Sequence, residues 1–321
     1  MNLKKNKKWI APAIVLLMAV LPLFIHSTYF ILLLNFAGLY MISVSGLDLL
    51  FGYTGQISLG HSAFYGIGAY CTAICTTRFG IPVLPAILIS ILVAVLFGML
   101  LAIPASKLVG HFLALLTICF GELFYQVVAN FTSWSGGFSG INFIPNIGIF
   151  GLTLHSNKAY YYFILVCVVL FMLFKQHLVN SRQGRAMIAI RENAHAANGT
   201  GVNVNKQKIA VFAISAAFTA FTGCVYACLV GYISPETFKQ SQSLIYLTML
   251  LLGGMGNFVG PLIGATLITF VKEYLQAYGS YQMLIYGAII IIVVLFAPDG
   301  IVGLAKSIGA KFKKKEAATN A

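Results

Sequence analysis

Long apolar runs, separated by short breaks that hold polar residues, glycine or proline, follow one another along most of the chain. An apolar α-helix of about 20 residues is long enough to cross the hydrocarbon core of a bilayer. The pattern therefore predicts an all-α, single-domain protein over residues 1–321 with about ten transmembrane helices, within a range of roughly nine to eleven. The predicted crossings are 9–27, 29–49, 61–77, 82–104, 109–129, 158–177, 208–233, 241–253, 259–276 and 281–297.

Composition supports a place in the membrane. The 321 residues are 60% hydrophobic and only 8% charged. A soluble domain has roughly a quarter of its residues charged, which it needs to cover a water-facing surface. The first apolar run, Trp9–Ser27, is interpreted as a retained crossing rather than a secretory signal, because no small-residue cleavage site follows it. We therefore expect a multi-pass protein of the lipid bilayer.

Positive charge is concentrated in three places. The net charge is +13, and the basic residues cluster at the start of the chain, in the tail 305–321 and around the break 178–207. Loops rich in lysine and arginine stay on the cytoplasmic side of a membrane. This predicts that both termini and 178–207 are cytoplasmic and that the glycine-rich loop 130–157 lies outside. Because the charge forms no single patch, no nucleic-acid partner is expected.

The central polar break contains a pattern typical of a short helix. Within Gly184–Ala197, apolar residues recur at the spacing of one helix face, and glycines follow as stop signals. Such a helix could lie on lipid headgroups or dock into a groove of a protein partner. Its apolar face is mostly alanine, which is small for insertion into lipid, so the sequence favours the protein partner.

Two glycine-rich breaks interrupt the apolar pattern. The first is Gly52–Gly60, within "GYTGQISLGHSAFYGIGAY" (52–70), and the second is "GGMGNFVG" (253–260). Irregular backbone at membrane depth persists only where it is buried in protein or lines a cavity. The sequence therefore predicts a translocation path at these breaks. The proposed path residues are Gly55, Gln56, Ser58, Gly60, His61, Glu122, Gly253, Gly256, Asn257 and Gly260.

Ionisable residues within the predicted crossings are few. His61 fits either a hydrogen-bonded interior histidine or a gate. Glu122 is predicted to lie deep and to pair with a polar group such as Gln126, one turn further along its helix. Asp48 is expected near the inner headgroups, so it carries less weight than Glu122. The scarcity of charge along this path suits a neutral or zwitterionic solute with an apolar side chain, or equally urea or a short amide.

The sequence lacks the motifs of an enzyme. No G-x-x-x-x-G-K-[ST] loop occurs, so this chain is not expected to bind ATP phosphates. No pair of carboxylates lies at helical spacing within a predicted crossing, and the 6 cysteines fall inside apolar segments without nearby clusters of histidine or carboxylate. We therefore expect no catalytic residue, no metal and no cofactor.

The central loop, "NSRQGRAMIAIRENAHAANGTGVNV" from Asn180 to Val204, resembles the coupling loop of the branched-chain amino acid permeases of bacterial ABC importers. Other passages resemble further landmarks of that family, in the family's order. They are "GYTGQISLGHSAFYGIGAY", "SGGFSGI" (135–141), "GGMGNFVGPLIGA" (253–265) and "FAPDGIVGL" (296–304). The length and the Arg-Glu-Asn loop resemble the "M" type of permease. His195 departs from the pattern, because the family usually has Glu or Asp there.

The resemblance implies a function and a set of partners. Such a chain forms half of a translocation path in the bacterial inner membrane, together with a second homologous permease, two ABC ATPase subunits and an extracytoplasmic substrate-binding protein. The residues implied to couple the path to the ATPase are Arg182, Gly184, Arg185, Ile190, Arg191, Glu192, Asn193, His195, Ala196, Ala197 and Gly201. The solute is implied to be a branched-chain amino acid, although related permeases carry urea or amides.

A stand-alone secondary transporter is the rival interpretation. It predicts a relay of several buried ionisable residues. The chain has only 7 carboxylate residues, and several of them fall in predicted cytoplasmic segments. The sequence therefore favours the ATP-driven importer.

Overall fold

The computed structural model describes residues 18–22, 24, 27–106, 110–149 and 152–275, together with scattered residues between 279 and 303. Most of the predicted crossings 9–27 and 281–297, and the predicted basic tail 305–321, lie outside the described residues. All statements about the structure below concern the described part.

Helices make up nearly all of the described chain, so the predicted all-α class is confirmed. Five helices are long and apolar enough to cross a membrane: α2 (Thr28–Thr54), α4 (Val83–Ala105), α5 (Gly110–Asn130), α7 (Asn157–Asn180) and α10 (Val204–Val230). Three shorter apolar helices complete the bundle: α3 (His61–Thr77), α11 (Gln240–Gly253) and α12 (Gly260–Leu275). Each corresponds to one predicted crossing.

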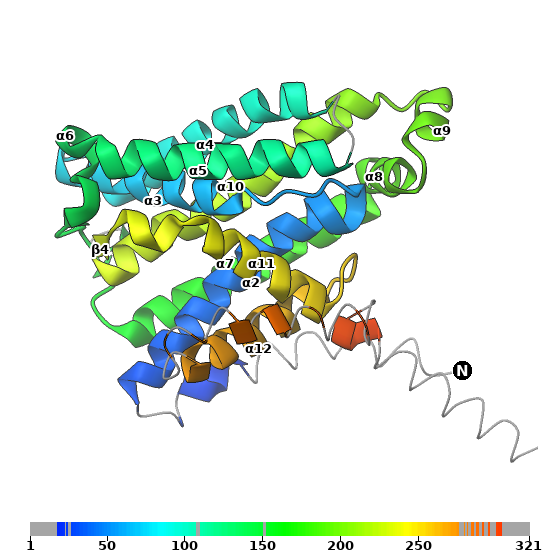
Figure 1. Cartoon of the computed structure of the whole chain (residues 1–321). Helices are drawn as coiled ribbons and strands as arrows, with labels where there is room; N and C mark the ends of the chain where they lie inside the picture. Colours follow the sequence, from blue (N-terminus) through cyan, green and yellow to red (C-terminus); the bar gives the residue numbers. More distant parts are fainter. Residues whose placement is uncertain are drawn as a thin grey trace, which may run out of the picture.

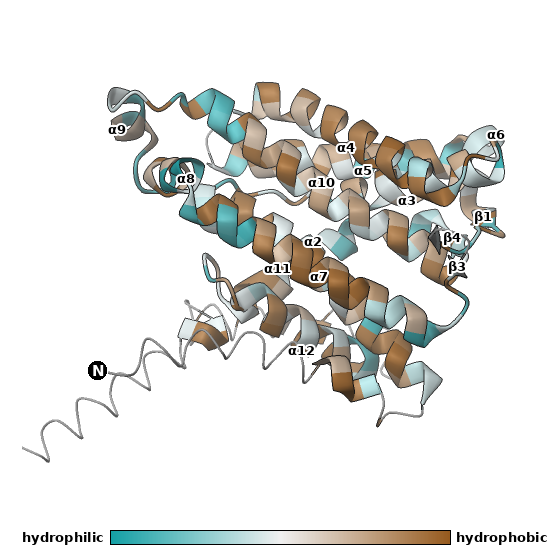
Figure 2. Cartoon of the chain, turned by 180° about the vertical axis from the view of Figure 1, so that it is seen from behind, coloured by the Kyte–Doolittle hydropathy of each residue, from teal (hydrophilic) through white to brown (hydrophobic). Residues whose placement is uncertain are grey.

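The long helices run between two ends of the molecule (Figure 1). One, here called the α8 end, carries α8 (Arg182–Glu192) and α9 (Ala194–Gly199). The other, here called the strand end, carries α6 (Thr132–Ser135), the 3₁₀ turns η1 (Gly137–Ser139) and η2 (Pro235–Phe238), and the four strands. Strand β1 (Ile141–Asn142) pairs antiparallel with β4 (Tyr232–Ile233), and β2 (Gly148–Ile149) pairs antiparallel with β3 (Leu152–Thr153). Figure 2 shows hydrophobic residues along the helices and hydrophilic ones around α8 and the start of α10.

Close approach of helix backbones holds the bundle together. A Cβ atom added at Gly68 of α3 would overlap with the carbonyl of Ala220 in α10, and one at Gly223 of α10 would overlap with the carbonyl of Tyr65 in α3. Small residues at a helix contact are the usual device for association in lipid, where burial of apolar surface gains little. The buried hydroxyls of Ser43 in α2 and Thr222 in α10 add a contact of 2.6 Å. Helix α2 is consequently enclosed by its neighbours.

Two predictions about local structure were wrong. Helix α2 continues through Gly52 to Thr54 and ends at Gly55, whose φ of 71° and N–H bonds to the carbonyls of Leu50 and Phe51 close the last turn. The first break therefore covers residues 55–60, not 52–60. The single helix expected over Gly184–Ala197 is two helices, because the side chain of Asn193 accepts the N–H groups of His195 and Ala196 and so begins α9.

Candidate functional site

The α8–α9 segment has one face against the bundle and one face in the open. Ser181 caps α8 by accepting the N–H groups of Gln183 and Gly184, and a Cβ at Gly184 would overlap with the carbonyl of Val179. Met187 and Ile190 are buried. Several residues of the segment are exposed; they are Arg182, Arg185, Arg191, Glu192, Asn193, His195 and Ala196. Of the remaining predicted coupling residues, Ala197 is buried and Gly201 is exposed.

Arg191 connects this segment to the bundle. Its Nη1 donates a hydrogen bond to the carbonyl of Gly52, near the end of α2. The same side chain lies beside both glycine breaks: a Cβ at Gly55 would be 3.4 Å from its Cγ, and a Cβ at Gly256 would be 3.1 Å from its Nη1. One arginine of the predicted coupling loop thus contacts the first break and lies against the second.

A buried ion pair lies next to this contact. Lys175 Nζ of α7 is 2.7 Å from Asp48 Oδ2 of α2, and both side chains have no solvent exposure. Asp48 Oδ1 accepts the N–H of Gly256 at 2.7 Å. The ammonium of Lys175 also lies 5.8 Å from the centre of the Tyr53 ring. One carboxylate oxygen of Asp48 therefore pairs with α7, and the other accepts a hydrogen bond from the break between α11 and α12.

The glycine at position 52 makes room for this arrangement. A Cβ there would overlap with Asp48 Oδ1 and would lie 2.6 Å from the backbone nitrogen of Gly256. We call the five residues Asp48, Gly52, Lys175, Arg191 and Gly256 the junction. It joins α2, α7, α8 and the second break, and it brings the two predicted glycine-rich passages together.

The second break is a tight turn of glycines. Gly254 and Gly256 have φ values of 108° and 67°, which are accessible to glycine at little cost. A Cβ at Gly253 would overlap with the carbonyl of Gly260, and one at Gly260 with the carbonyl of Gly254. The two predicted path residues Gly253 and Gly260 therefore pack backbone against backbone. Between them, the amide of Asn257 donates to the carbonyl of Met255 at 3.4 Å.

The first break has its backbone groups satisfied by neighbouring helices. Thr117 Oγ1 of α5 accepts the N–H of Leu59 at 3.0 Å, and Gln240 Nε2 of α11 donates to the Leu59 carbonyl at 2.6 Å. Gln56 is buried and donates to Thr54 Oγ1 at 3.1 Å. A Cβ at Gly60 would overlap with the carbonyl of Thr117. Gly55 is exposed, whereas Gln56, Ser58 and Gly60 are buried. Most of the break is thus packed in protein, one of the two settings in which irregular backbone persists at membrane depth.

His61 is held between two hydroxyls. Its Nδ1 lies 3.1 Å from Ser58 Oγ, and its Nε2 lies 2.8 Å from Ser215 Oγ. Because Ser215 Oγ donates to the carbonyl of Gly46 at 2.7 Å, its oxygen accepts from His61 Nε2–H. Both ring nitrogens of this buried side chain therefore have a hydroxyl partner. Of the two interpretations of His61, this geometry matches the hydrogen-bonded interior histidine.

Glu122 lies away from the junction. It is exposed on α5, and Gln126 Nε2 donates to its carboxylate at 2.8 Å, so the expected pairing is confirmed. From the sequence, Asp48 carries less weight than Glu122. The structure places Asp48 in the interior and Glu122 on the outside of this chain.

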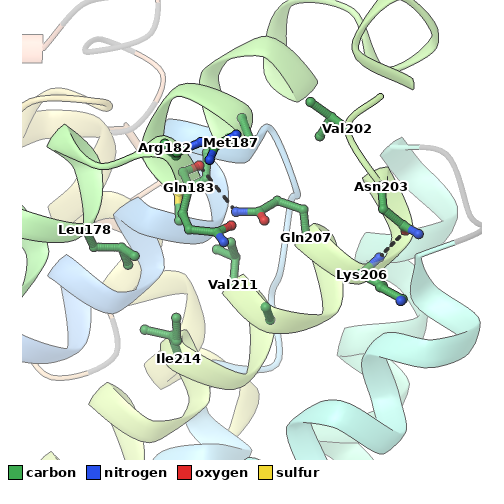
Figure 3. A pocket seen from close by; sticks show the side chains of 12 residues that line it. Leu178, Arg182, Gln183, Met187, Val202, Asn203, Lys206, Gln207, Val211 and Ile214 are labelled. Carbon is green, nitrogen blue, oxygen red and sulfur yellow. Dashed lines mark hydrogen bonds between the residues drawn. The ribbon is translucent and has the colours of Figure 1, made fainter. Parts of the chain in front are cut away.

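A hollow separates α8 from the first turns of α10 (Figure 3). Its volume is about 760 Å³. Arg182, Gln183 and Met187 line one side, and Lys206 and Gln207 lie across from them (Figure 3). Gln207 Nε2 bridges the two sides by donating to the carbonyl of Gln183 at 3.3 Å. No group of three or more His, Cys, Asp or Glu residues able to hold a metal occurs in the described part of the chain.

Comparison with known proteins assigns the family. A sequence model described as branched-chain amino acid transport system / permease component matches residues 29–294, which include the junction and the α8–α9 segment. The chain belongs to this permease family. The resemblance drawn from the motifs is thereby confirmed.

Several named permeases are similar to the chain. It is 30% identical over 291 residues to the high-affinity branched-chain amino acid transport system permease protein LivM of Escherichia coli (strain K12), a match that covers 84% of this chain and 68% of the relative. It is 25% identical to a probable branched-chain amino acid transport permease protein LivM of Methanocaldococcus jannaschii, over 88% of this chain and 96% of the relative. It is 26% identical to the high-affinity branched-chain amino acid transport system permease protein BraD of Pseudomonas aeruginosa, over 82% of this chain and 91% of the relative. No solved structure matched the chain.

The sequence does not single out the buried pair of the junction. Lys175 is one of the basic residues around the break 178–207, and Asp48 carries less weight than Glu122 among the ionisable residues of the crossings. A signal was present, since both residues are charged positions inside apolar runs, and the predicted order of crossings puts both near the same membrane face.

Proposed function

We propose that the chain is the membrane-spanning permease subunit of a binding-protein-dependent ABC importer for branched-chain amino acids. In this proposal it crosses the bacterial inner membrane about ten times, with both termini and the α8 end in the cytoplasm. A second homologous permease completes the path, and a substrate-binding protein docks on the loop 130–157. Family membership and the printed function of the relatives support this assignment.

The proposal places ATP hydrolysis on two separate ATPase subunits that contact the open face of α8 and α9. One observation carries this: the exposed segment is tied by Arg191 to the carbonyl of Gly52, and Arg191 also lies against the second break. A partner that displaces α8 would therefore act on α2 and on the 254–259 turn through the side chain of Arg191. The mechanism needs no nucleotide site in this chain.

The solute of this proposed path is a leucine-type zwitterion. Within the described bundle the interior charge of Asp48 is neutralised by Lys175, so the interior adds little net charge to repel or trap a solute whose own charges cancel. The relatives are named for branched-chain amino acids, which favours them over urea and short amides.

Uptake by reconstituted complexes tests the assignment. The chain, its partner permease, the ATPases and the binding protein are placed in liposomes, and ATP-dependent entry of leucine, isoleucine, valine and urea is measured. We expect the three amino acids to enter and urea to be excluded. The double variant Arg185→Glu/Glu192→Lys, which alters only the open face of α8, should abolish uptake and lose the ATPases. Its matched control is Glu236→Lys/Lys239→Glu at the strand end. Normal uptake by the α8 variant, or amino-acid uptake without ATP, would overturn the proposal.

A further inference from the structure

The Asp48–Lys175 ion pair calls for an explanation beyond stability. It joins α2 to α7 across 127 positions of sequence, with both side chains fully buried. Taking two charges out of water is costly, and their attraction repays that cost only with good geometry and further hydrogen bonds. Replacing such a pair by apolar residues of similar size is often neutral or stabilising. Stability alone is therefore a weak reason for this pair.

The partners of Asp48 show what the pair positions. Lys175 occupies Oδ2, while the N–H of Gly256 occupies Oδ1. The ammonium thus orients the carboxylate, and the carboxylate orients the glycine turn between α11 and α12. Because a side chain at Gly52 would overlap with Asp48 Oδ1, the space for this contact is kept open by the end of α2.

Arg191 reaches the same place from α8. It bonds to the carbonyl of Gly52, within one turn of Asp48, and lies 3.1 Å from the Cβ position of Gly256. Arg191 is exposed on its helix, whereas Asp48 and Lys175 are not. The junction therefore has a fixed part, the buried pair, and a part that belongs to a surface segment.

We propose that the Asp48–Lys175 pair is a positioning device for transport: it holds the Gly256 turn in place so that displacement of α8, delivered through Arg191, moves the second break rather than being absorbed at the end of α2. This inference rests on the proposed function, because it assumes that a partner acts on α8. Asp48 and Lys175 are then positioning residues that never contact the solute. Without the pair, ATP hydrolysis continues and the path no longer responds to it.

Neutral variants of the pair separate this role from a structural one. In Asp48→Asn/Lys175→Gln both charges are removed together, so no unpaired charge is left in the interior. With the complete complex in liposomes, we expect leucine transported per ATP hydrolysed to fall by about tenfold or more, the size of a typical coupling between two sites. Complex assembly and ATP hydrolysis stay near those of the unaltered protein. Lys175→Arg, which keeps the positive charge, should transport more leucine per ATP hydrolysed than the double neutral variant.

The outcomes are distinct from those that test the function itself. If the unaltered complex takes up no amino acid with ATP, the proposed function fails, whatever the variants do. If the unaltered complex does take up amino acid, two results of the double neutral variant overturn the positioning role. One is a normal ratio of leucine transported to ATP hydrolysed, and the other is the loss of ATP hydrolysis together with uptake. The matched control is Glu236→Gln/Lys239→Gln, which removes an exposed pair and should leave the ratio unchanged.

A measurement on the unaltered complex covers the case in which the neutral variant does not assemble. Hydrogen–deuterium exchange is followed in the peptide that contains residues 254–259, with and without ATP turnover. We expect turnover to change exchange at the Gly256 amide, whose hydrogen is bonded to Asp48. Unchanged exchange in this peptide during active uptake would overturn the proposal.

Discussion

The two ion pairs of the described chain differ in almost every respect. Asp48 and Lys175, at the α8 end, come from different helices and have 0% exposure each. Glu236 and Lys239, at the strand end, are neighbours at i and i+3, with side-chain exposures of 52% and 44%. Tyr125 donates to Glu236 at 3.0 Å, and the Lys239 ammonium beside Glu236 holds the pKa of that carboxyl below its ordinary value.

The comparison shows that location decides what an ion pair can do. An exposed ion pair is surrounded by water and salt, which screen the attraction between its charges, so it contributes little to stability. The buried pair has no solvent to replace a lost partner, so each of its members depends on the other. Of the two pairs, the buried one therefore ties the position of one long helix, α2, to that of another, α7.

The largest effect is expected when one partner of the buried pair is removed. Lys175→Met leaves the Asp48 carboxylate buried without its cation, and breaking such a pair typically costs about 3–5 kcal/mol. The midpoint temperature of thermal unfolding, measured on the purified protein in detergent, should fall sharply. Asp48→Leu combined with Lys175→Met should recover most of the loss. Equal losses in the single and double variants would mean that the two charges do not compensate each other.

A smaller effect is expected from crowding the junction without touching its charges. Gly52→Ala places a methyl group against Asp48 Oδ1 and the nitrogen of Gly256, and overpacking of this kind costs about 1–3 kcal/mol. Both stability and leucine uptake should fall. The control is Gly287→Ala, where an added Cβ also meets nothing within 4 Å. If the two alanine variants behaved alike, the packing at Gly52 would not be tight.

The smallest effect is expected at the exposed pair. Glu236→Gln removes the charge that Lys239 contacts, yet both side chains stay hydrated. The midpoint temperature of thermal unfolding and the rate of leucine uptake should match those of the unaltered protein. A loss as large as that of Lys175→Met would remove the contrast between the two pairs.

Much of the bundle could be predicted from the sequence because apolar runs and their breaks coincide with helix ends. Helix α3 has the predicted bounds, and α4 and α5 are displaced by one residue at each end. The end of α2 was misplaced because Gly52, although a poor helix former, continues the helix when its missing side chain makes room for Asp48. Asn193 was passed over because the apolar spacing continues beyond it, whereas its side chain caps α9.

The junction could be predicted only in part. The sequence motifs single out Arg191 and the two glycine passages as candidate site residues. Their contact could not be predicted, because a single sequence does not state which helices adjoin. The pairing of Asp48 with Lys175 depends on α2 lying against α7, a fact of packing between segments far apart in the chain.

Arg191 offers the most direct test of the account, since its side chain reaches from the α8 segment to the carbonyl of Gly52 and to both glycine breaks. The measurement is leucine transported per ATP hydrolysed by the complete complex in liposomes, for Arg191→Ala beside the unaltered protein. The account predicts that the variant still hydrolyses ATP while the ratio falls by about tenfold or more. An unchanged ratio would contradict it.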